Sequence, residues 1–158
     1  VLSEKTGSLI ATSGRFGAML SGCDQEVVDT LTKFGEQIGV AFQLADDIVD
    51  ITSMSEQSGK IPGTDLREGI PTLAGLIALT QAHPEDAQLR ELLSRPLPDP
   101  AEHEVALELL RNHSSLNEAR LEACRWADEA RRTLEPLPDI GAKETLIALC
   151  DYVVTRTG

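Results

Sequence analysis

The segment FQLADDIVD, residues 42–50, places Asp46, Asp47 and Asp50 in a stretch that is otherwise mostly apolar. Apolar residues recur at helical spacing before and through this segment, so we expect one long, largely buried helix over residues 24–53. The aspartates would then lie in its last turns, within an apolar interior. The segment therefore predicts a helical fold with carboxylates gathered near one helix end.

These carboxylates are costly on such a helix. Asp46 and Asp50 lie about 40° apart around the axis, in the same arc as Gln43 and Gly39. Like charges four residues apart repel, the helix end is itself negative, and the next basic residue after the segment is Lys60. Two readings stay open: a solvated acidic patch, or a shared cation. Hard oxygen ligands without a calcium-loop pattern suit Mg²⁺ with waters and ligand phosphates, and Gly39 would leave room for that ligand.

Two lysines extend the cation reading to a phosphate site. Lys5 lies in EKTGSL near the start of the chain, and Lys60 lies in the Gly-rich stretch SGKIPGTD just after the aspartates. Each lysine taken alone is more often a solvated surface residue. Together with the aspartates they form the set that binds a diphosphate, with Mg²⁺ bridging carboxylates to phosphate oxygens and lysines neutralising the remaining charge.

Composition limits the possible partners. The 158 residues carry a formal net charge of -12 with 3% aromatic residues, which argues against nucleic acid as a partner. The three cysteines have no CxxC spacing, which favours a reducing compartment and no zinc site. We expect a cytoplasmic location and no transmembrane segment. The chain begins at Val1, inside an expected helix, so we expect that an upstream part is missing.

The rest of the chain also predicts helices, and no segment has the period-2 pattern of a strand. Expected helices cover residues 2–21, 24–53, 72–82, 84–94, 99–113, 115–134 and 142–156, with a loop over 55–71. Asp24 is the expected N-cap of the second helix, and Ser115 with Glu118 forms a capping-box pattern. A stripe of small residues in the first helix should let a neighbouring helix approach closely: Gly7, Ala11, Gly14 and Ala18. His83, His103 and His113 receive no role.

The sequence resembles the C-terminal half of the trans-isoprenyl diphosphate synthases, or polyprenyl synthetases. Residues 42–50 fit the family's second aspartate-rich motif, FQxxDDxxD, at every defined position. Lys5 and Thr6 resemble its KT motif, GKIPGTD at 59–65 resembles its G-K-x-x-G-x-D loop, and the tail YVVTR ends at Arg156 as in the family. The family's first aspartate-rich motif and its GGKRxRP motif do not occur in these residues. The resemblance implies an all-α, isoprenoid-synthase-type helical bundle of which residues 1–158 form the C-terminal portion.

The implied activity is Mg²⁺-dependent condensation of isopentenyl diphosphate with an allylic prenyl diphosphate, in a homodimeric enzyme. The resemblance assigns metal binding to Asp46, Asp47 and Asp50. It assigns catalysis to Lys5, Thr6, Phe42 and Gln43, and diphosphate binding to Lys5, Thr6, Gln43 and Lys60. For Phe42, core packing is an equal alternative to a π-face offered to a carbocation. Two other functions stay open, a class I terpene synthase and a non-catalytic partner subunit, and we expect this chain alone to be inactive.

Overall fold

The computed structural model describes residues 6–53, 62–81 and 83–156, and within these ranges it is helical with no strand, which confirms the all-α prediction. The chain divides into two compact units. Unit 1 comprises residues 1–45 and 122–156, and unit 2 comprises residues 46–121. Each unit has its own apolar core. That the whole chain belongs to one synthetase domain stays a prediction.

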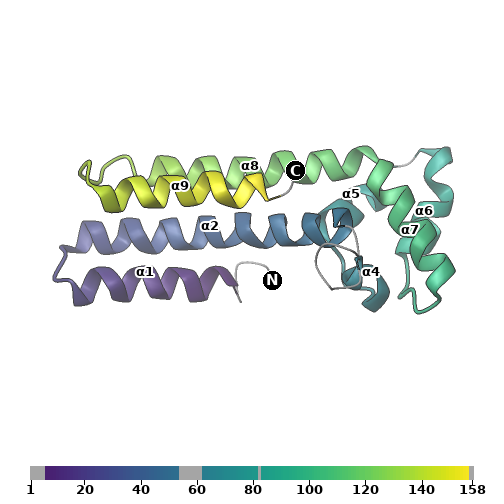
Figure 1. The fold of residues 1–158 in the computed structure, drawn as a ribbon, viewed down its shortest axis with the longest axis horizontal. Coiled ribbons are helices and arrows are strands. Elements are labelled where there is room, and N and C mark those ends of the chain that lie inside the picture. The colour runs from purple at the N-terminus through teal and green to yellow at the C-terminus, as the bar shows by residue number, and fades with distance from the viewer. Residues whose placement is uncertain (1–5, 54–61, 82, 157–158) are drawn as a thin grey trace. The chain divides into compact units, whose positions relative to one another are not determined.

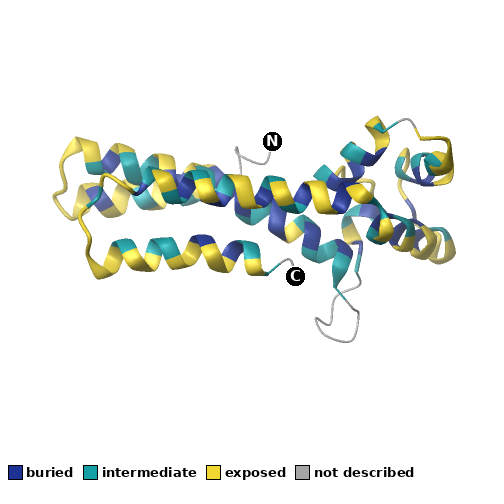
Figure 2. Cartoon of the chain, turned by 90° about the horizontal axis from the view of Figure 1, so that it is seen from above, coloured by how far each residue is buried: buried dark blue, intermediate teal, exposed yellow. Residues whose placement is uncertain are grey.

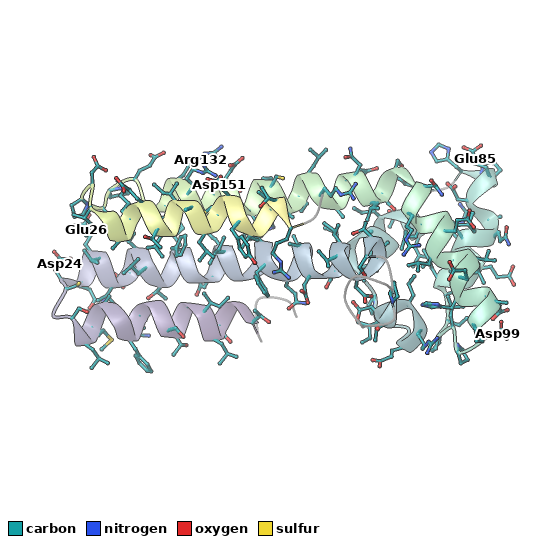
Figure 3. All side chains as sticks on the ribbon, in the orientation of Figure 1. Asp24, Glu26, Glu85, Asp99, Arg132 and Asp151 are labelled. Carbon is teal, nitrogen blue, oxygen red and sulfur yellow. The ribbon has the colours of Figure 1, made fainter. Side chains whose placement is uncertain are left out.

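Unit 1 is built from helices that run alongside one another (Figure 1). They are α1 (Ser8–Leu20), the first part of α2 (Gln25–Thr52), the second part of α8 (Ser114–Thr133) and α9 (Gly141–Thr155). Asp24 lies at the start of α2 (Figure 3) and its carboxylate accepts the Val27 backbone N–H at 3.0 Å. The predicted N-cap is therefore confirmed, and α2 has nearly the predicted bounds.

The core of unit 1 joins α2, α8 and α9. Its buried members alternate with exposed residues along each helix, so that dark blue follows one face and yellow the other in Figure 2. They are Phe34, Ile38, Ala41, Ala45, Ala127, Ala130, Leu134, Cys150 and Val153. Burial of these side chains is what holds the helices of unit 1 together, because removal of apolar surface from water is the main favourable contribution to folding.

Small residues bring α1 and α2 into backbone contact. A Cβ atom at Gly35 would lie 2.5 Å from the Cα of Ala11, and one at Gly39 would lie 2.5 Å from the Cα of Gly7. A Cβ at Gly14 would lie 2.8 Å from a backbone oxygen of α2. The predicted close approach along the small-residue stripe is therefore confirmed. The expectation that Gly39 leaves room for a ligand is wrong, because Gly39 is buried against Gly7.

Unit 2 contains the end of α2, the start of α8 and several shorter helices between them. These are α4 (Thr64–Glu68), α5 (Leu73–Thr80), the 3-10 turn η2 (Pro84–Asp86), α6 (Ala87–Leu93) and α7 (Pro100–Asn112). Leu92, Leu97 and Ala106 form a buried cluster in which α6 meets α7. The prediction of a loop over residues 55–71 is wrong where α4 forms. Gly63 and Gly69 flank α4 with left-handed backbone angles, φ 70° and 72°, which glycine adopts without strain.

Two predicted helix starts in unit 2 have different outcomes. Asp99 begins α7 (Figure 3), accepting the backbone N–H groups of Ala101 and Glu102 at 3.0 Å each, as expected for an N-cap. The capping box at the start of α8 is wrong, because Ser115 lies inside the helix and its backbone N–H donates to Nδ1 of His113 at 3.1 Å. The imidazole therefore replaces the predicted hydroxyl cap.

None of the helices in the described ranges has the length and apolar character needed to cross a membrane.

Candidate functional site

The three aspartates lie on the last turns of α2, and two of them, Asp46 and Asp50, lie on the side away from its buried residues. Leu44, Ile48 and Ile51 occupy one arc of the helix and are buried. Asp46 and Asp50 lie roughly on the opposite arc, because a helix turns by about 100° per residue. Asp46 is exposed, whereas Asp47 and Asp50 are half-buried. The expectation of an apolar interior is therefore wrong for Asp46, which faces outward from the core, whereas Asp47 lies nearer the buried arc.

Asp50 connects α2 to the start of α4 within unit 2. Its Oδ1 accepts the backbone N–H of Thr64 and its Oδ2 accepts that of Asp65, each at 3.2 Å. Its backbone oxygen accepts the N–H of Gly63 at 2.8 Å. The first N–H groups of a helix lack partners within the helix and carry partial positive charge. Backbone amides, which the sequence did not reveal, therefore offset part of the charge of Asp50.

Asp65 joins the aspartates of α2 as a further acid. The pKa of Asp65 is raised, first by burial and then by the negative charges of Asp50, Glu68 and Asp46. A raised carboxyl pKa caused by like charges means that the ionised group is electrostatically unfavourable there. A divalent cation would relieve this repulsion, and carboxylate oxygens are the ligands that Mg²⁺ prefers. The donor chemistry therefore fits Mg²⁺.

The carboxylates alone do not form a closed metal cage. Among residues 6–53, 62–81 and 83–156, no group of three or more His, Cys, Asp or Glu side chains is arranged to hold a metal ion. Mg²⁺ commonly takes only one or two carboxylates and completes its shell with water and ligand phosphates. Metal binding by Asp46, Asp47 and Asp50 stays a prediction, and a site of this kind needs the ligand to complete it.

In unit 1, the structure brings two of the predicted site residues together. The hydroxyl of Thr6 donates to Oε1 of Gln43 at 3.1 Å, joining the segment that leads into α1 to α2. This pair lies next to the contact of Gly7 with Gly39. Close approach of the two helix backbones is thus what places Thr6 within reach of Gln43.

The ring of Phe42 has a cation over one face. The guanidinium of Arg156 lies 4.6 Å from the ring centroid, and the ring also packs against the core of unit 1. Both features favour the packing interpretation of Phe42 over a π-face offered to substrate. The two predicted lysines, Lys5 and Lys60, lie outside the described residues.

Sequence reasoning missed two residues that hold this region in place. His103 is buried in α7, and its Nε2 lies 2.8 Å from the carbonyl oxygen of Gly63. Arg111, also on α7, donates to the carbonyl oxygens of Ile51 and Ser53 at 2.7 and 2.9 Å. These pairs are separated by 40 to 60 positions in the sequence, so no local pattern could have indicated them.

Comparison with known proteins places this arrangement in context. The chain is 48% identical over 158 residues to the nonaprenyl diphosphate synthase of Mycobacterium tuberculosis, covering 100% of this chain and 47% of the relative. It is 37% identical over 153 residues to the decaprenyl-diphosphate synthase of Dictyostelium discoideum, covering 97% of this chain and 33% of that relative.

Solved structures show the same fold. The geranylgeranyl pyrophosphate synthase of Corynebacterium glutamicum, complexed with calcium and isoprenyl diphosphate, superposes with a TM-score of 0.91 at 43% identity. The match covers 99% of this chain and 49% of that chain. A polyprenyl synthase of Caulobacter crescentus, also complexed with calcium and isoprenyl diphosphate, gives a TM-score of 0.89 at 33% identity, covering 99% of this chain and 48% of that one.

The similarity extends through the whole chain, whereas the relatives are longer. The chain spans about half the length of the M. tuberculosis synthase and of the two solved structures. Residues 1–110 match the family profile described as polyprenyl synthetase, and the fold and the resemblance in residues 42–50 agree with that match. The chain therefore belongs to the polyprenyl synthetase family.

Proposed function

We propose that this chain is the C-terminal half of a trans-isoprenyl diphosphate synthase and provides its second aspartate-rich, metal-dependent diphosphate site. The whole enzyme condenses isopentenyl diphosphate with an allylic prenyl diphosphate. The allylic C–O bond breaks, a new C–C bond forms to isopentenyl diphosphate, and inorganic diphosphate and a proton leave. Two solved relatives were complexed with calcium and isoprenyl diphosphate, which supports a ligand of this class.

One observation carries this proposal above the others. The amides of Thr64 and Asp65 donate to the Asp50 carboxylate, so the start of α4 brings Asp65 to the aspartates of α2, where burial and then the charges of Asp50, Glu68 and Asp46 raise its pKa. Mg²⁺, when bound, would supply the positive charge that neutralises both these carboxylates and a diphosphate.

The aspartates of α2 have different duties in this proposal. Asp46 is exposed and Asp47 half-buried, so both are placed to bind a cation that arrives with its ligand. Asp50 has its carboxylate oriented by the amides of Thr64 and Asp65, and it fixes α4 beside the end of α2. Asp50 therefore holds the site together in addition to contributing charge.

The remaining predicted residues would act on the substrate. The Thr6 hydroxyl orients the Gln43 amide, which then presents a fixed polar group from α2. Lys5 and Lys60 would bind phosphate oxygens directly.

We further propose that the whole protein is a homodimer. Helix α1 exposes a set of apolar side chains suited to protein contacts: Leu9, Phe16, Met19 and Leu20. A cytoplasmic location stays a prediction.

The test uses the full-length protein. Isothermal titration with inorganic pyrophosphate should show binding that requires Mg²⁺, and labelled isopentenyl diphosphate should be incorporated into product. Asp46→Asn should weaken this binding at least about tenfold and should reduce turnover by orders of magnitude. Its matched control, Glu36→Gln, removes another exposed acid of α2 and should change neither.

Two outcomes would refute the proposal or replace it. Pyrophosphate binding that is the same with and without Mg²⁺, or unchanged by Asp46→Asn, would remove the metal site. Mg²⁺-dependent binding without incorporation of isopentenyl diphosphate in the full-length protein would favour the non-catalytic partner subunit.

A further inference from the structure

Side chains of α7 reach the two backbone segments that carry the acidic residues. Arg111 donates from Nε to the carbonyl of Ile51 at 2.7 Å and from its terminal nitrogen to the carbonyl of Ser53 at 2.9 Å. His103, about two turns earlier on α7, has Nε2 2.8 Å from the carbonyl of Gly63. A single helix thus contacts both the end of α2 and the residue preceding α4.

The Arg111 contact stabilises the end of α2. The last carbonyls of a helix lack intrahelical donors and carry partial negative charge, so a guanidinium is favourable there. Arg111 satisfies two such carbonyls at once, in a partly buried position. Hydrogen bonds to a charged group are stronger than neutral ones. The end of α2 is therefore held at a defined place relative to α7.

The His103 contact fixes the start of α4. The imidazole is 4% exposed, and since a carbonyl can only accept, Nε2 carries the proton. Gly63 has φ 70°, and a Cβ there would lie 2.8 Å from Nε2 of His103. Glycine is required at this position both for its backbone angle and for the approach of the imidazole. A buried carbonyl that lost this donor would be costly.

The amides of Thr64 and Asp65 that bind Asp50 belong to the segment that follows Gly63, and Asp50 directly precedes Ile51. We propose that His103 and Arg111 are positioning residues that fix the end of α2 and the start of α4 in the register needed for Mg²⁺-diphosphate binding. This inference rests on the proposed function for the ligand, but its structural part does not depend on any activity.

The first experiment measures hydrogen exchange in the full-length protein. His103→Leu keeps a side chain of similar size but removes the N–H donor, whereas His103→Gln restores an N–H at the position of Nε2. Exchange of the Thr64 and Asp65 amides should be about tenfold faster in the Leu variant, which corresponds to a decrease of about 1.4 kcal/mol in the free energy of local opening. In the Gln variant, the exchange rate should return toward its original value. Amides of residues 123–130 in α8 serve as the internal control and should not change.

The second experiment measures pyrophosphate binding as a function of Mg²⁺ concentration. Loss of an orienting residue typically lowers metal affinity by about 10- to 100-fold. His103→Leu should therefore raise the half-saturating Mg²⁺ concentration by about tenfold, with unchanged stoichiometry. His103→Gln should reverse most of this increase. Arg111→Met, which keeps the aliphatic packing, should act in the same direction. It provides an independent test where His103→Leu does not fold.

The results separate this inference from the proposed function. Unchanged exchange of the Thr64 and Asp65 amides, or a Gln variant as impaired as the Leu variant, would overturn the positioning role. Faster exchange with unaltered Mg²⁺ dependence would overturn the link to metal binding. Absence of Mg²⁺-dependent pyrophosphate binding in the unaltered protein would refute the proposed function, while the exchange data would still decide whether His103 holds α4.

Discussion

Replacing Gly35 by alanine tests whether backbone contact between α1 and α2 is a requirement of the fold. The new Cβ would lie 2.5 Å from Cα and 2.7 Å from N of Ala11, and 2.9 Å from the carbonyl carbon of Ile10. All three are backbone atoms, so no side chain can rotate away. To reach the 3.4 Å at which ordinary contact begins, α1 would have to move by about 0.9 Å.

The size of the effect follows from two opposing contributions. Alanine is favoured over glycine in a helix interior by about 1 kcal/mol. Overpacking typically costs about 1–3 kcal/mol, and the upper value applies at Gly35 because the obstacle is backbone. The net loss should be about 2 kcal/mol, which corresponds to a fall of about 4–8 °C in melting temperature. Gly17→Ala is the matched control: it lies within α1 with nothing inside 4 Å of its Cβ, and should raise the melting temperature by about 2–4 °C.

Thermal melting of the two variants, followed by circular dichroism under the same conditions, measures the difference directly. If Gly35→Ala were as stable as Gly17→Ala, the close approach of α1 to α2 would be wrong. The contact also affects the site, because the pair formed by Thr6 and Gln43 lies beside it. Gly35→Ala should therefore also weaken pyrophosphate binding in the full-length protein.

Three further predictions concern ionisable side chains. Asp50→Asn keeps one oxygen acceptor but turns an N–H toward a backbone amide of α4. It should therefore lower the free energy of unfolding, measured with denaturant, by about 2 kcal/mol, and it should also weaken Mg²⁺-dependent binding. No loss of stability would contradict the anchoring role of Asp50. Because the pKa of Asp65 is raised in the folded protein, its ionisation destabilises the fold as pH rises through the folded pKa. Asp65→Asn should therefore raise the melting temperature at pH 7, with a gain that vanishes below the ordinary Asp pKa of 3.8. Burial raises the pKa of the Cys150 thiol, whereas Cys23 and Cys124 are exposed. Iodoacetamide should therefore modify Cys23 and Cys124 in the native protein and Cys150 only after unfolding, as detected by mass spectrometry.

Local patterns in the sequence predicted the long helices well. Apolar periodicity located α2 to within a residue at each end, and the caps Asp24 and Asp99 form as their side chains indicate. These features depend on residues a few positions apart, which a sequence displays directly. The short helix α4 was missed because its flanking glycines read as loop, although glycine in a left-handed conformation also delimits a helix.

The candidate site was only half visible in the sequence. The pattern of residues 42–50 indicated which carboxylates gather on α2, but not what offsets their charge. The backbone N–H of Asp65 donates to the Asp50 carboxylate across 15 positions of sequence, and the His103 imidazole contacts the Gly63 carbonyl across 40. Such contacts depend on how α4 and α7 pack, which periodicity does not encode. For the same reason, neither acid-neutralising amides nor an imidazole anchor was expected.

Charges in unit 2 bear on how the proposed ligand would bind. The sequence offered Lys60 as the next basic residue after the aspartates, but folding also brings Arg111 onto the carbonyls at the end of α2 and the amides of α4 onto Asp50. These groups act on the helix end and on one carboxylate. The pKa of Asp65 is still raised, first by its burial and then by the charges of Asp50, Glu68 and Asp46. Ionised Asp65 is therefore disfavoured in this fold, and we expect a divalent cation bound there with a diphosphate to lower that cost.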